Sequence, residues 1–214
     1  MTNTQLKSNI AGHLLKINAV VLKPDEPFTW SSGLKSPIYC DNRLTLSYPR
    51  VRAAIADGMV ALIQEHYPDA DVIAGTATAG IPHAAWVSER LDLPMAYIRG
   101  SAKSHGKKKR IEGLIEAGQK VVIVEDLIST GGSVLSAAEA IREEGAEVLG
   151  AVAIFTYGLE TATVNFKEAQ VPFVTLTDFQ ELAQQAKENG QLTDAQLQKL
   201  SIWHQNPQSD AWMK

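Results

Sequence analysis

Short apolar runs separated by helical segments constrain the fold of this chain more than any other feature of its sequence. Five runs of five to eight residues have the length and composition of buried strands, at residues 71–75, 94–98, 120–124, 148–155 and 171–176. Segments with apolar residues at helical spacing lie between and after them, around residues 81–91, 133–144, 159–169, 178–188 and 193–204. Because apolar runs without polar alternation are typical of parallel strands covered on both faces, we expect an α/β fold: a central, mostly parallel five-stranded sheet flanked by helices.

The two ends of the chain do not follow this alternation of strands and helices. Residues 4–22 carry apolar side chains at near-helical spacing, and Lys23-Pro24 is the expected end of that helix. Residues 27–46 are rich in turn formers and β-formers, so they predict a hairpin or two short strands. At the other end, the seven residues after Pro207 are expected to be loose.

Composition and charge exclude several classes of protein. The chain has 214 residues, of which 45% are hydrophobic, which is enough for the core of one globular α/β domain. No apolar run approaches the roughly 20 residues that span a bilayer, and the N-terminus lacks the apolar stretch of a signal peptide. With a single cysteine, Cys40, and a net charge of −4, we expect a cytoplasmic protein that binds neither membranes nor nucleic acid.

The segment VVIVEDLISTGGS, residues 121–133, carries the strongest chemical signal. A strand is expected to end in two adjacent acids, Glu125 and Asp126, and small residues follow before a helix that opens at Ser133. Small residues let successive backbone N–H groups converge, and a helix N-terminus adds partial positive charge, so the segment suits a phosphate monoester. The acids would then face a neutral or cationic part of the ligand, such as ribose hydroxyls. An ordinary glycine-rich connection is the alternative, whereas the spacing fits neither a Walker A loop nor a dinucleotide fingerprint.

The spacing of these 13 residues resembles the signature for 5-phosphoribosyl 1-pyrophosphate (PRPP) in the type I phosphoribosyltransferases. The resemblance implies a catalytic role for Asp126 and a Mg²⁺ cofactor held by PRPP oxygens and water, with no direct protein ligand. The residues that it implies for PRPP binding are Glu125, Asp126, Leu127, Ile128, Ser129, Thr130, Gly131, Gly132 and Ser133.

A basic segment follows the second expected strand. Six of the chain's 20 lysines and arginines lie between Arg99 and Arg110, with no acid among them. The glycine-flanked sequence RGSAKSHGKKKRIEG is typical of a mobile loop over a ligand, or of a solvated or nucleic-acid-binding surface. It is similar to the catalytic loop of orotate phosphoribosyltransferases. That similarity implies that Arg99, Lys103 and His105 bind the pyrophosphate group, the last two as catalytic residues, and that loop 99–112 enters the active site of the other chain in a homodimer.

The segment FTWSSGLKSPIYCDNR, residues 28–43, resembles the region of that family that covers the base. The resemblance implies that Phe28 and Lys35, together with Ser129, contact orotate, while core packing is the alternative for Phe28. On chemical grounds alone, Arg43 is a candidate for a bidentate pair with the orotate carboxylate.

The segment IAGTATAGIPHA, residues 73–84, matches the family's pyrophosphate loop. The N–H groups implied for diphosphate binding are those of Thr76, Ala77, Thr78, Ala79 and Gly80. Some members carry lysines where this chain has Ala79 and Ser31, and an arginine after the fourth strand that FTYGLE lacks. The cations that neutralise the diphosphate and the orotate carboxylate are therefore left open.

The resemblance covers about residues 5–190 and implies a type I phosphoribosyltransferase-like fold with a small N-terminal hood subdomain and a flexible catalytic loop. The implied reaction is transfer of ribose 5-phosphate from PRPP to orotate, which gives orotidine 5′-monophosphate and pyrophosphate in de novo pyrimidine (UMP) biosynthesis. The alternatives are transfer to another nucleobase, or a PRPP-sensing regulator that binds nucleic acid. We predict a single domain over residues 1–214, with the hood at 1–46, the α/β core at 47–190 and a C-terminal helix and tail at 191–214.

Overall fold

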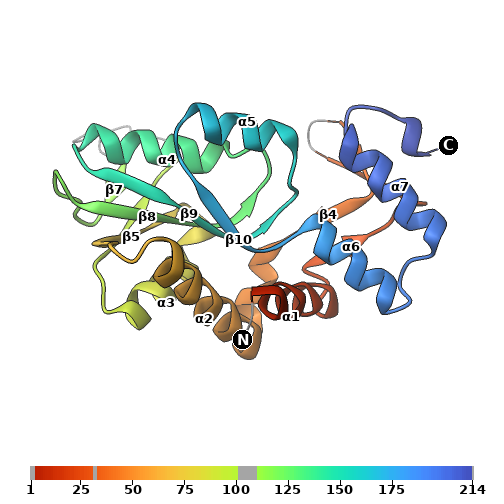
Figure 1. The fold of residues 1–214 in the computed structure, drawn as a ribbon, viewed down its shortest axis with the longest axis horizontal. Coiled ribbons are helices and arrows are strands. Elements are labelled where there is room, and N and C mark those ends of the chain that lie inside the picture. Colours follow the sequence, from red (N-terminus) through yellow and green to blue (C-terminus); the bar gives the residue numbers. More distant parts are fainter. Residues whose placement is uncertain (1–2, 31–32, 101–109, 214) are drawn as a thin grey trace. The chain divides into compact units, whose positions relative to one another are not determined.

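A computed structural model describes residues 3–30, 33–100 and 110–213 of the chain (Figure 1). The chain forms two compact units, and each is described by itself. Unit 1 comprises residues 1–48 and 177–214, and unit 2 comprises residues 49–176. The predicted subdivision into hood, core and C-terminal tail stays a prediction.

Unit 2 is built on a six-stranded sheet with the order β10-β9-β8-β5-β6-β7. The strands are β5 (Val72–Thr76), β6 (Met95–Ile98), β7 (Ile111–Glu112), β8 (Lys120–Ile128), β9 (Glu147–Thr156) and β10 (Phe173–Asp178). The pairs β5–β6, β5–β8 and β8–β9 are parallel, and β6–β7 is antiparallel. The predicted α/β fold and mostly parallel sheet are confirmed. The sequence did not predict β7, because a two-residue strand has no recognisable periodicity.

Helices cover both faces of this sheet. In Figure 1, α4 (Gly132–Glu143) and α5 (Glu160–Glu168) lie on one side of the strands, and α2 (Pro49–His66) and α3 (Gly80–Leu91) lie on the other. The apolar residues of β8 from Val121 to Val124 are inaccessible to solvent. Burial of each such side chain contributes about 1.5–3 kcal/mol to the free energy of folding, so the central strands anchor the loops at their carboxyl ends.

Unit 1 combines the two ends of the chain. Its helices are α1 (Asn3–Lys16), α6 (Phe179–Glu188) and α7 (Asp194–Gln205), and its 3-10 helices are η1 (Asn42–Ser47) and η2 (Ala211–Met213). Two antiparallel pairs join β1 (Val20–Leu22) to β4 (Ile38–Cys40) and β2 (Phe28–Thr29) to β3 (Lys35–Ser36). No helix in the described ranges of either unit is long and apolar enough to cross a membrane.

Two predicted elements at the chain ends are wrong. The predicted helix over 4–22 ends at Lys16, because Asn18 adopts a left-handed conformation (φ 55°) and the β-branched Val20 pairs with Cys40. The tail after Pro207 is not loose as far as residue 213, because Trp212 is 1% exposed and anchors η2.

The strand that carries the two acids is also longer than predicted. We expected its apolar run to end at residue 124 and the two acids to close the strand, but β8 continues to Ile128. The extension follows from pairing with β9, where Leu127 lies opposite Phe155. Glu125 and Asp126 are therefore held within a sheet rather than in a loop, which fixes their backbone.

Candidate active site

The segment predicted to bind a phosphate lies between β8 and α4, and its residues 129–133 are called the nest below. Gly131 precedes α4 with a φ of 89°, and a Cβ at this position would overlap the ring of Phe166. The carbonyl of Thr130 accepts a hydrogen bond of 2.9 Å from Asn165 Nδ2, which ties the loop to α5. No side chain caps α4 at Gly131, so the first N–H groups of the helix are available to an anion.

The two acids next to the nest interact with each other. Glu125 is 6% exposed, and its Oε1 accepts a 2.9 Å hydrogen bond from the backbone N–H of Asp126. Burial, reinforced by the neighbouring charge of Asp126, raises the pKa of Glu125 to about 8. At neutral pH the carboxyl group of Glu125 is therefore largely protonated, so it can donate a hydrogen bond.

The loop between β5 and α3 is anchored on β8 just before these acids. Thr76 Oγ1 donates a 3.2 Å hydrogen bond to the carbonyl of Val124, and a Cβ on Gly80 would overlap that same carbonyl. Only glycine at position 80 therefore permits this approach of α3 to β8. The same loop contains a cis peptide bond between Ala77 and Thr78.

One N–H group of the predicted diphosphate set is already engaged. The N–H of Ala77 donates a 2.8 Å hydrogen bond to the carbonyl of Ile98. A diphosphate could bind the N–H of Ala77 only by displacing this hydrogen bond, and the predicted role of the loop stays a prediction. No side chain caps α3 at Ala79, which leaves the start of that helix suited to an anion.

A cavity of about 270 Å³ brings the pyrophosphate loop, the nest and the stems of the basic segment together. All of its lining residues belong to unit 2: Thr76, Ala77, Ile98, Arg99, Gly100, Arg110, Gly132, Ser133, Ser136 and Ala137. Three segments that were each predicted to bind a part of PRPP thus line one cavity.

The two arginines at this cavity have different partners. Arg99 Nη1 lies 3.4 Å from Glu112 Oε1, and the Arg99 N–H donates to the carbonyl of Arg110 at 2.8 Å. Arg110 donates from Nε to the carbonyl of Arg99 at 3.2 Å and from Nη2 to Ser136 Oγ at 2.9 Å. The predicted Lys103 and His105 lie outside the described residues, as does Ser31.

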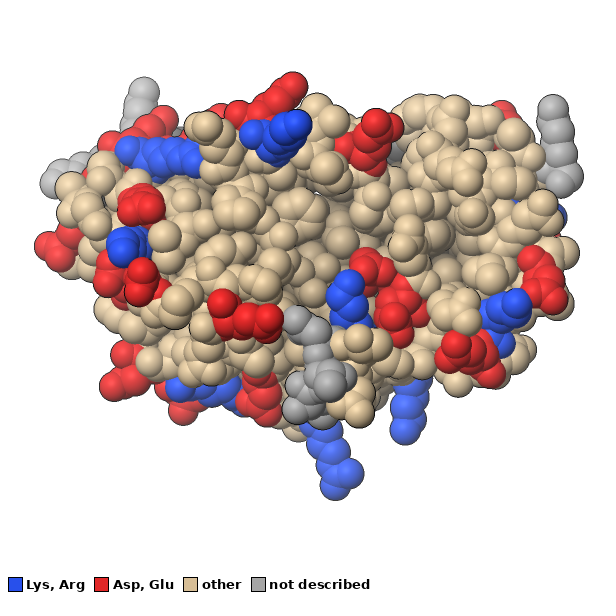
Figure 2. All heavy atoms as spheres, in the orientation of Figure 1, with Lys and Arg blue, Asp and Glu red and all other residues tan. Residues whose placement is uncertain are grey.

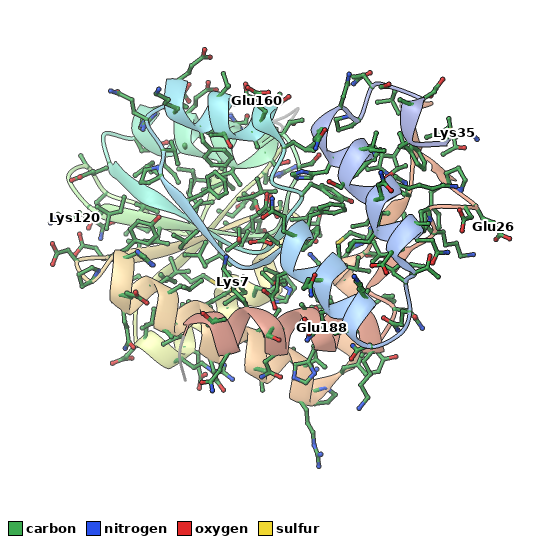
Figure 3. All side chains as sticks on the ribbon, turned by 45° about the vertical axis from the view of Figure 1, so that its right-hand side comes forward. Lys7, Glu26, Lys35, Lys120, Glu160 and Glu188 are labelled. Carbon is green, nitrogen blue, oxygen red and sulfur yellow. The ribbon has the colours of Figure 1, made fainter. Side chains whose placement is uncertain are left out.

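The residues predicted to contact the base lie partly in unit 1. Phe28, in β2, packs against Tyr39 with ring centroids 5.5 Å apart. Lys35, in β3, projects to solvent and donates a 2.7 Å hydrogen bond to Thr29 Oγ1 (Figure 3). Ser129, the third predicted orotate residue, follows β8 in unit 2.

Arg43, the candidate for the orotate carboxylate, already has a carboxylate partner. Its Nε lies 2.7 Å from Asp41 Oδ1, in η1 and its cap. A bidentate pair with a substrate would have to compete with this contact.

Sequence reasoning missed three residues that support the site. Ser136 and Asn165 lie on helices, where a single polar residue carries no signal of its partner. Arg110 was visible only as one charge in a basic run, because its contact with α4 depends on tertiary structure.

Known proteins resemble the chain at the level of both sequence and fold. A family model described as the phosphoribosyl transferase domain matches residues 48–187. The orotate phosphoribosyltransferase of Bacillus cereus (strain B4264) is 59% identical over 208 residues, which are 97% of this chain and 99% of that protein. The protein of the same name from Bacillus pumilus is 58% identical over 209 residues, 98% of this chain and 99% of the relative.

Solved structures agree with the sequence relatives. The orotate phosphoribosyltransferase of Aeropyrum pernix matches with a TM-score of 0.74 and 28% identity, covering 86% of this chain and 99% of that one. The UMP synthase of Leishmania donovani matches with a TM-score of 0.77 and 27% identity, covering 92% of this chain and 42% of that longer one. Because the relatives align over almost their whole length and share the fold, the chain belongs to the phosphoribosyltransferase family, among the orotate phosphoribosyltransferases.

Proposed function

We propose that the chain transfers ribose 5-phosphate from PRPP to orotate, giving orotidine 5′-monophosphate and pyrophosphate in pyrimidine biosynthesis. The observation that carries the proposal is the cavity of unit 2, where the nest at Gly132 and Ser133 meets Thr76 and two arginines. Such a cavity offers backbone N–H groups to a phosphate and guanidinium groups to a diphosphate, which are the two anionic groups of PRPP.

The chemistry divides among residues of this chain. The nest holds the 5-phosphate, and Glu125 and Asp126 face the ribose, where positive charge develops as the bond from C1 to the pyrophosphate breaks. The nitrogen of the base attacks C1 from the opposite face, so no covalent intermediate with the enzyme is required. Arg99, together with Lys103 and His105 of the basic loop, stabilises the charge on the departing pyrophosphate.

Mg²⁺ is the expected cofactor. Mg²⁺ at phosphate sites usually takes oxygen ligands from the substrate, from water and from one or two carboxylates. Asp126 lies in β8 shortly before the nest, where its carboxyl group would accept hydrogen bonds from waters of the ion, while PRPP oxygens and water would hold the ion directly. When bound, the ion offsets the negative charge that the departing pyrophosphate gains.

Recognition of the base is assigned to Phe28, Lys35 and Ser129. The ring of Phe28 offers an apolar wall to the planar pyrimidine, and the ammonium group of Lys35 offers a cation to its anionic groups. Arg43 remains a candidate for the orotate carboxylate, provided that the substrate displaces its contact with Asp41.

The test of substrate class is a turnover assay with PRPP and Mg²⁺ in which orotate, uracil, hypoxanthine and adenine compete. We expect orotate to be converted and the other bases to compete poorly. Preferential use of a purine or of uracil would overturn the assignment to orotate, and absence of PRPP binding would overturn the whole proposal. A variant with Lys103→Ala should lose turnover and keep its fold, which circular dichroism checks.

A regulator that binds nucleic acid is the rival from another class. On the face shown in Figure 2, lysines and arginines of the described residues are interspersed with acids, and they form no continuous basic surface there. Nucleic-acid binding relies on such a surface. Retardation of RNA or DNA in a gel at physiological salt would favour the regulator, and we expect none.

We further propose that the chain acts in the cytoplasm as a homodimer in which loop 99–112 serves the partner's site through Lys103 and His105, while Arg99 and Arg110 at its two ends stay at the cavity of their own chain. Mixing inactive Lys103→Ala chains with inactive Asp126→Asn chains should then restore partial activity, because one site of each mixed dimer keeps both residues. A mixture that stays inactive while forming dimers would contradict this exchange.

A further inference from the structure

The two arginines of the cavity differ in how much of their charge a ligand can use. The guanidinium of Arg99 lies 3.4 Å from the carboxylate of Glu112, so part of its field is neutralised. Arg110 contacts only neutral oxygens among its described partners, the carbonyl of Arg99 and the hydroxyl of Ser136. Arg110 is therefore the cavity arginine whose positive charge is not offset by a carboxylate of the described residues.

Arg110 is also held in place before any ligand arrives. Its carbonyl accepts the N–H of Arg99, directly before the antiparallel pairing of Ile98 with Ile111. Its Nη2 reaches Ser136, in the second turn of α4, whose first residues form the nest. A guanidinium that is already held at Nε by a backbone carbonyl and at Nη2 by a hydroxyl loses little entropy when it binds a ligand, and this favours affinity.

The remaining donors of Arg110 suit a diphosphate. A guanidinium carries five N–H donors, and the contacts with Arg99 and Ser136 use two of them. The others can meet phosphate oxygens in the two-pronged geometry that distinguishes arginine from lysine. Thr76 and Ala77, the start of the pyrophosphate loop, line the same cavity.

We propose that Arg110 binds the diphosphate group of PRPP in the cavity of its own chain, supplying the cation for which this sequence has no lysine at Ala79. Ser136 acts as a positioning residue that holds the fork of Arg110 against α4. The proposal rests on the proposed function, because it names a further residue for the same donor substrate.

The closing experiment uses ligands that carry different phosphate groups. Calorimetric titrations with Mg²⁺ compare PRPP, inorganic pyrophosphate and orotidine 5′-monophosphate, of which only the last lacks a diphosphate. For Arg110→Gln we expect roughly 10-fold to 100-fold weaker binding of PRPP and pyrophosphate, because a charge-assisted hydrogen bond is lost. Binding of orotidine 5′-monophosphate should stay within about twofold of the wild type, since its phosphate uses the nest.

Three variants separate a binding role from a structural one. Arg110→Lys should recover part of the affinity for pyrophosphate, because it keeps the charge and loses the fork. Ser136→Ala should weaken pyrophosphate binding by less than Arg110→Gln does. Arg142→Gln is the matched control, since Arg142 lies at the other end of α4 and donates to the carbonyls of Ala169 and Gln170.

Each result bears on the proposal in one direction. Unchanged affinity of Arg110→Gln for pyrophosphate would overturn it, and so would an equal loss for orotidine 5′-monophosphate, which would indicate damage to the nest. If Arg110→Gln does not fold, Arg110→Lys and Ser136→Ala carry the same comparison. A wild type that binds no PRPP would instead refute the proposed function, so the two failures are distinguishable.

A mixing experiment tests whether Arg110 serves its own chain. Chains with Arg110→Gln and chains with Asp126→Asn should show no more activity together than the sum of the separate proteins, because each site of a mixed dimer lacks one residue. Recovery above that sum would move Arg110 to the partner's site and overturn this part of the proposal.

Discussion

The phosphate site of unit 2 and the β2–β3 hairpin of unit 1 are held by different kinds of contact. In unit 2, backbone atoms make the site: Gly131 adopts a φ of 89° against Phe166, and Gly80 lies against the carbonyl of Val124. In unit 1, side chains from the far end of the sequence hold the hairpin. Asp25 accepts hydrogen bonds of 2.8 Å from both Gln196 and Lys199, and Trp30 packs edge-on against Trp203 with ring centroids 6.0 Å apart.

The two kinds of contact correspond to two tasks of the site, which are binding of the phosphates and recognition of the base. The matched phosphoribosyl transferase domain, residues 48–187, includes all of unit 2. The hairpin and α7, by contrast, lie outside the match. A site made of backbone accepts any donor with the right phosphates, whereas side chains set the shape of a base-binding surface. We therefore expect changes in unit 2 to affect PRPP and changes in the hairpin supports to affect orotate.

Gly131→Ala should have a large effect on both stability and PRPP binding. The new Cβ would overlap Phe166 at a φ that alanine disfavours, so we expect stability to fall by about 1–3 kcal/mol and PRPP binding to be lost. Urea unfolding and calorimetry measure the two effects. Gly132→Ala is the control, because its Cβ would meet no described atom within 4 Å, and it should keep the wild-type stability. Equal stability of the two variants would contradict a nest that depends on backbone geometry.

Asp126→Asn should reduce turnover on the order of 10²-fold while PRPP still binds, because the variant keeps the shape and removes the charge that faces the ribose. Initial rates at saturating substrates measure the effect. Glu139→Gln, on the exposed face of α4, should behave as the wild type. Comparable turnover of Asp126→Asn and the control would remove Asp126 from the mechanism.

The buried Glu125 should make unit 2 less stable as the pH rises. Its pKa of about 8 in the folded chain exceeds its ordinary value of 4.5, so between these two values the folded state holds a proton that the unfolded state has lost. The free energy of unfolding should therefore fall with rising pH across this window, by at most about 1.4 kcal/mol per pH unit from this group. The difference in stability between wild type and Glu125→Gln, followed by urea unfolding from pH about 5 to about 8, isolates the effect. A difference that does not change with pH would show that Glu125 is ionised throughout.

Local features of the site could be predicted from the sequence. The 13 residues at 121–133 contain their own determinants, since the small residues and the helix start are contiguous, and the structure has the strand, turn and helix in that order. The end of β8 could not be predicted, because it depends on pairing with Phe155 of β9. Nor could the supports of the hairpin, because Asp25 and Lys199 are 174 positions apart and each reads as a solvated charge.

Asp25→Asn should have the smallest effect and the most specific one. Lys199 and Gln196 hold the pKa of Asp25 below its usual value, so Asp25 stays ionised at neutral pH and orders the chain just before Phe28. Because the contact is exposed, we expect a KM for orotate raised only a few fold, with kcat and the KM for PRPP unchanged.

The control for Asp25→Asn lies on α7, the helix that carries Gln196 and Lys199. Asp194→Asn removes the ion pair of Asp194 with Lys187, at the start of α7, without touching the hairpin, and it should leave both KM values unchanged. If Asp25→Asn raises the KM for PRPP as much as that for orotate, the hairpin does not act on the base alone. If neither KM changes, α7 stabilises unit 1 without shaping the surface that Phe28 and Lys35 offer to the base.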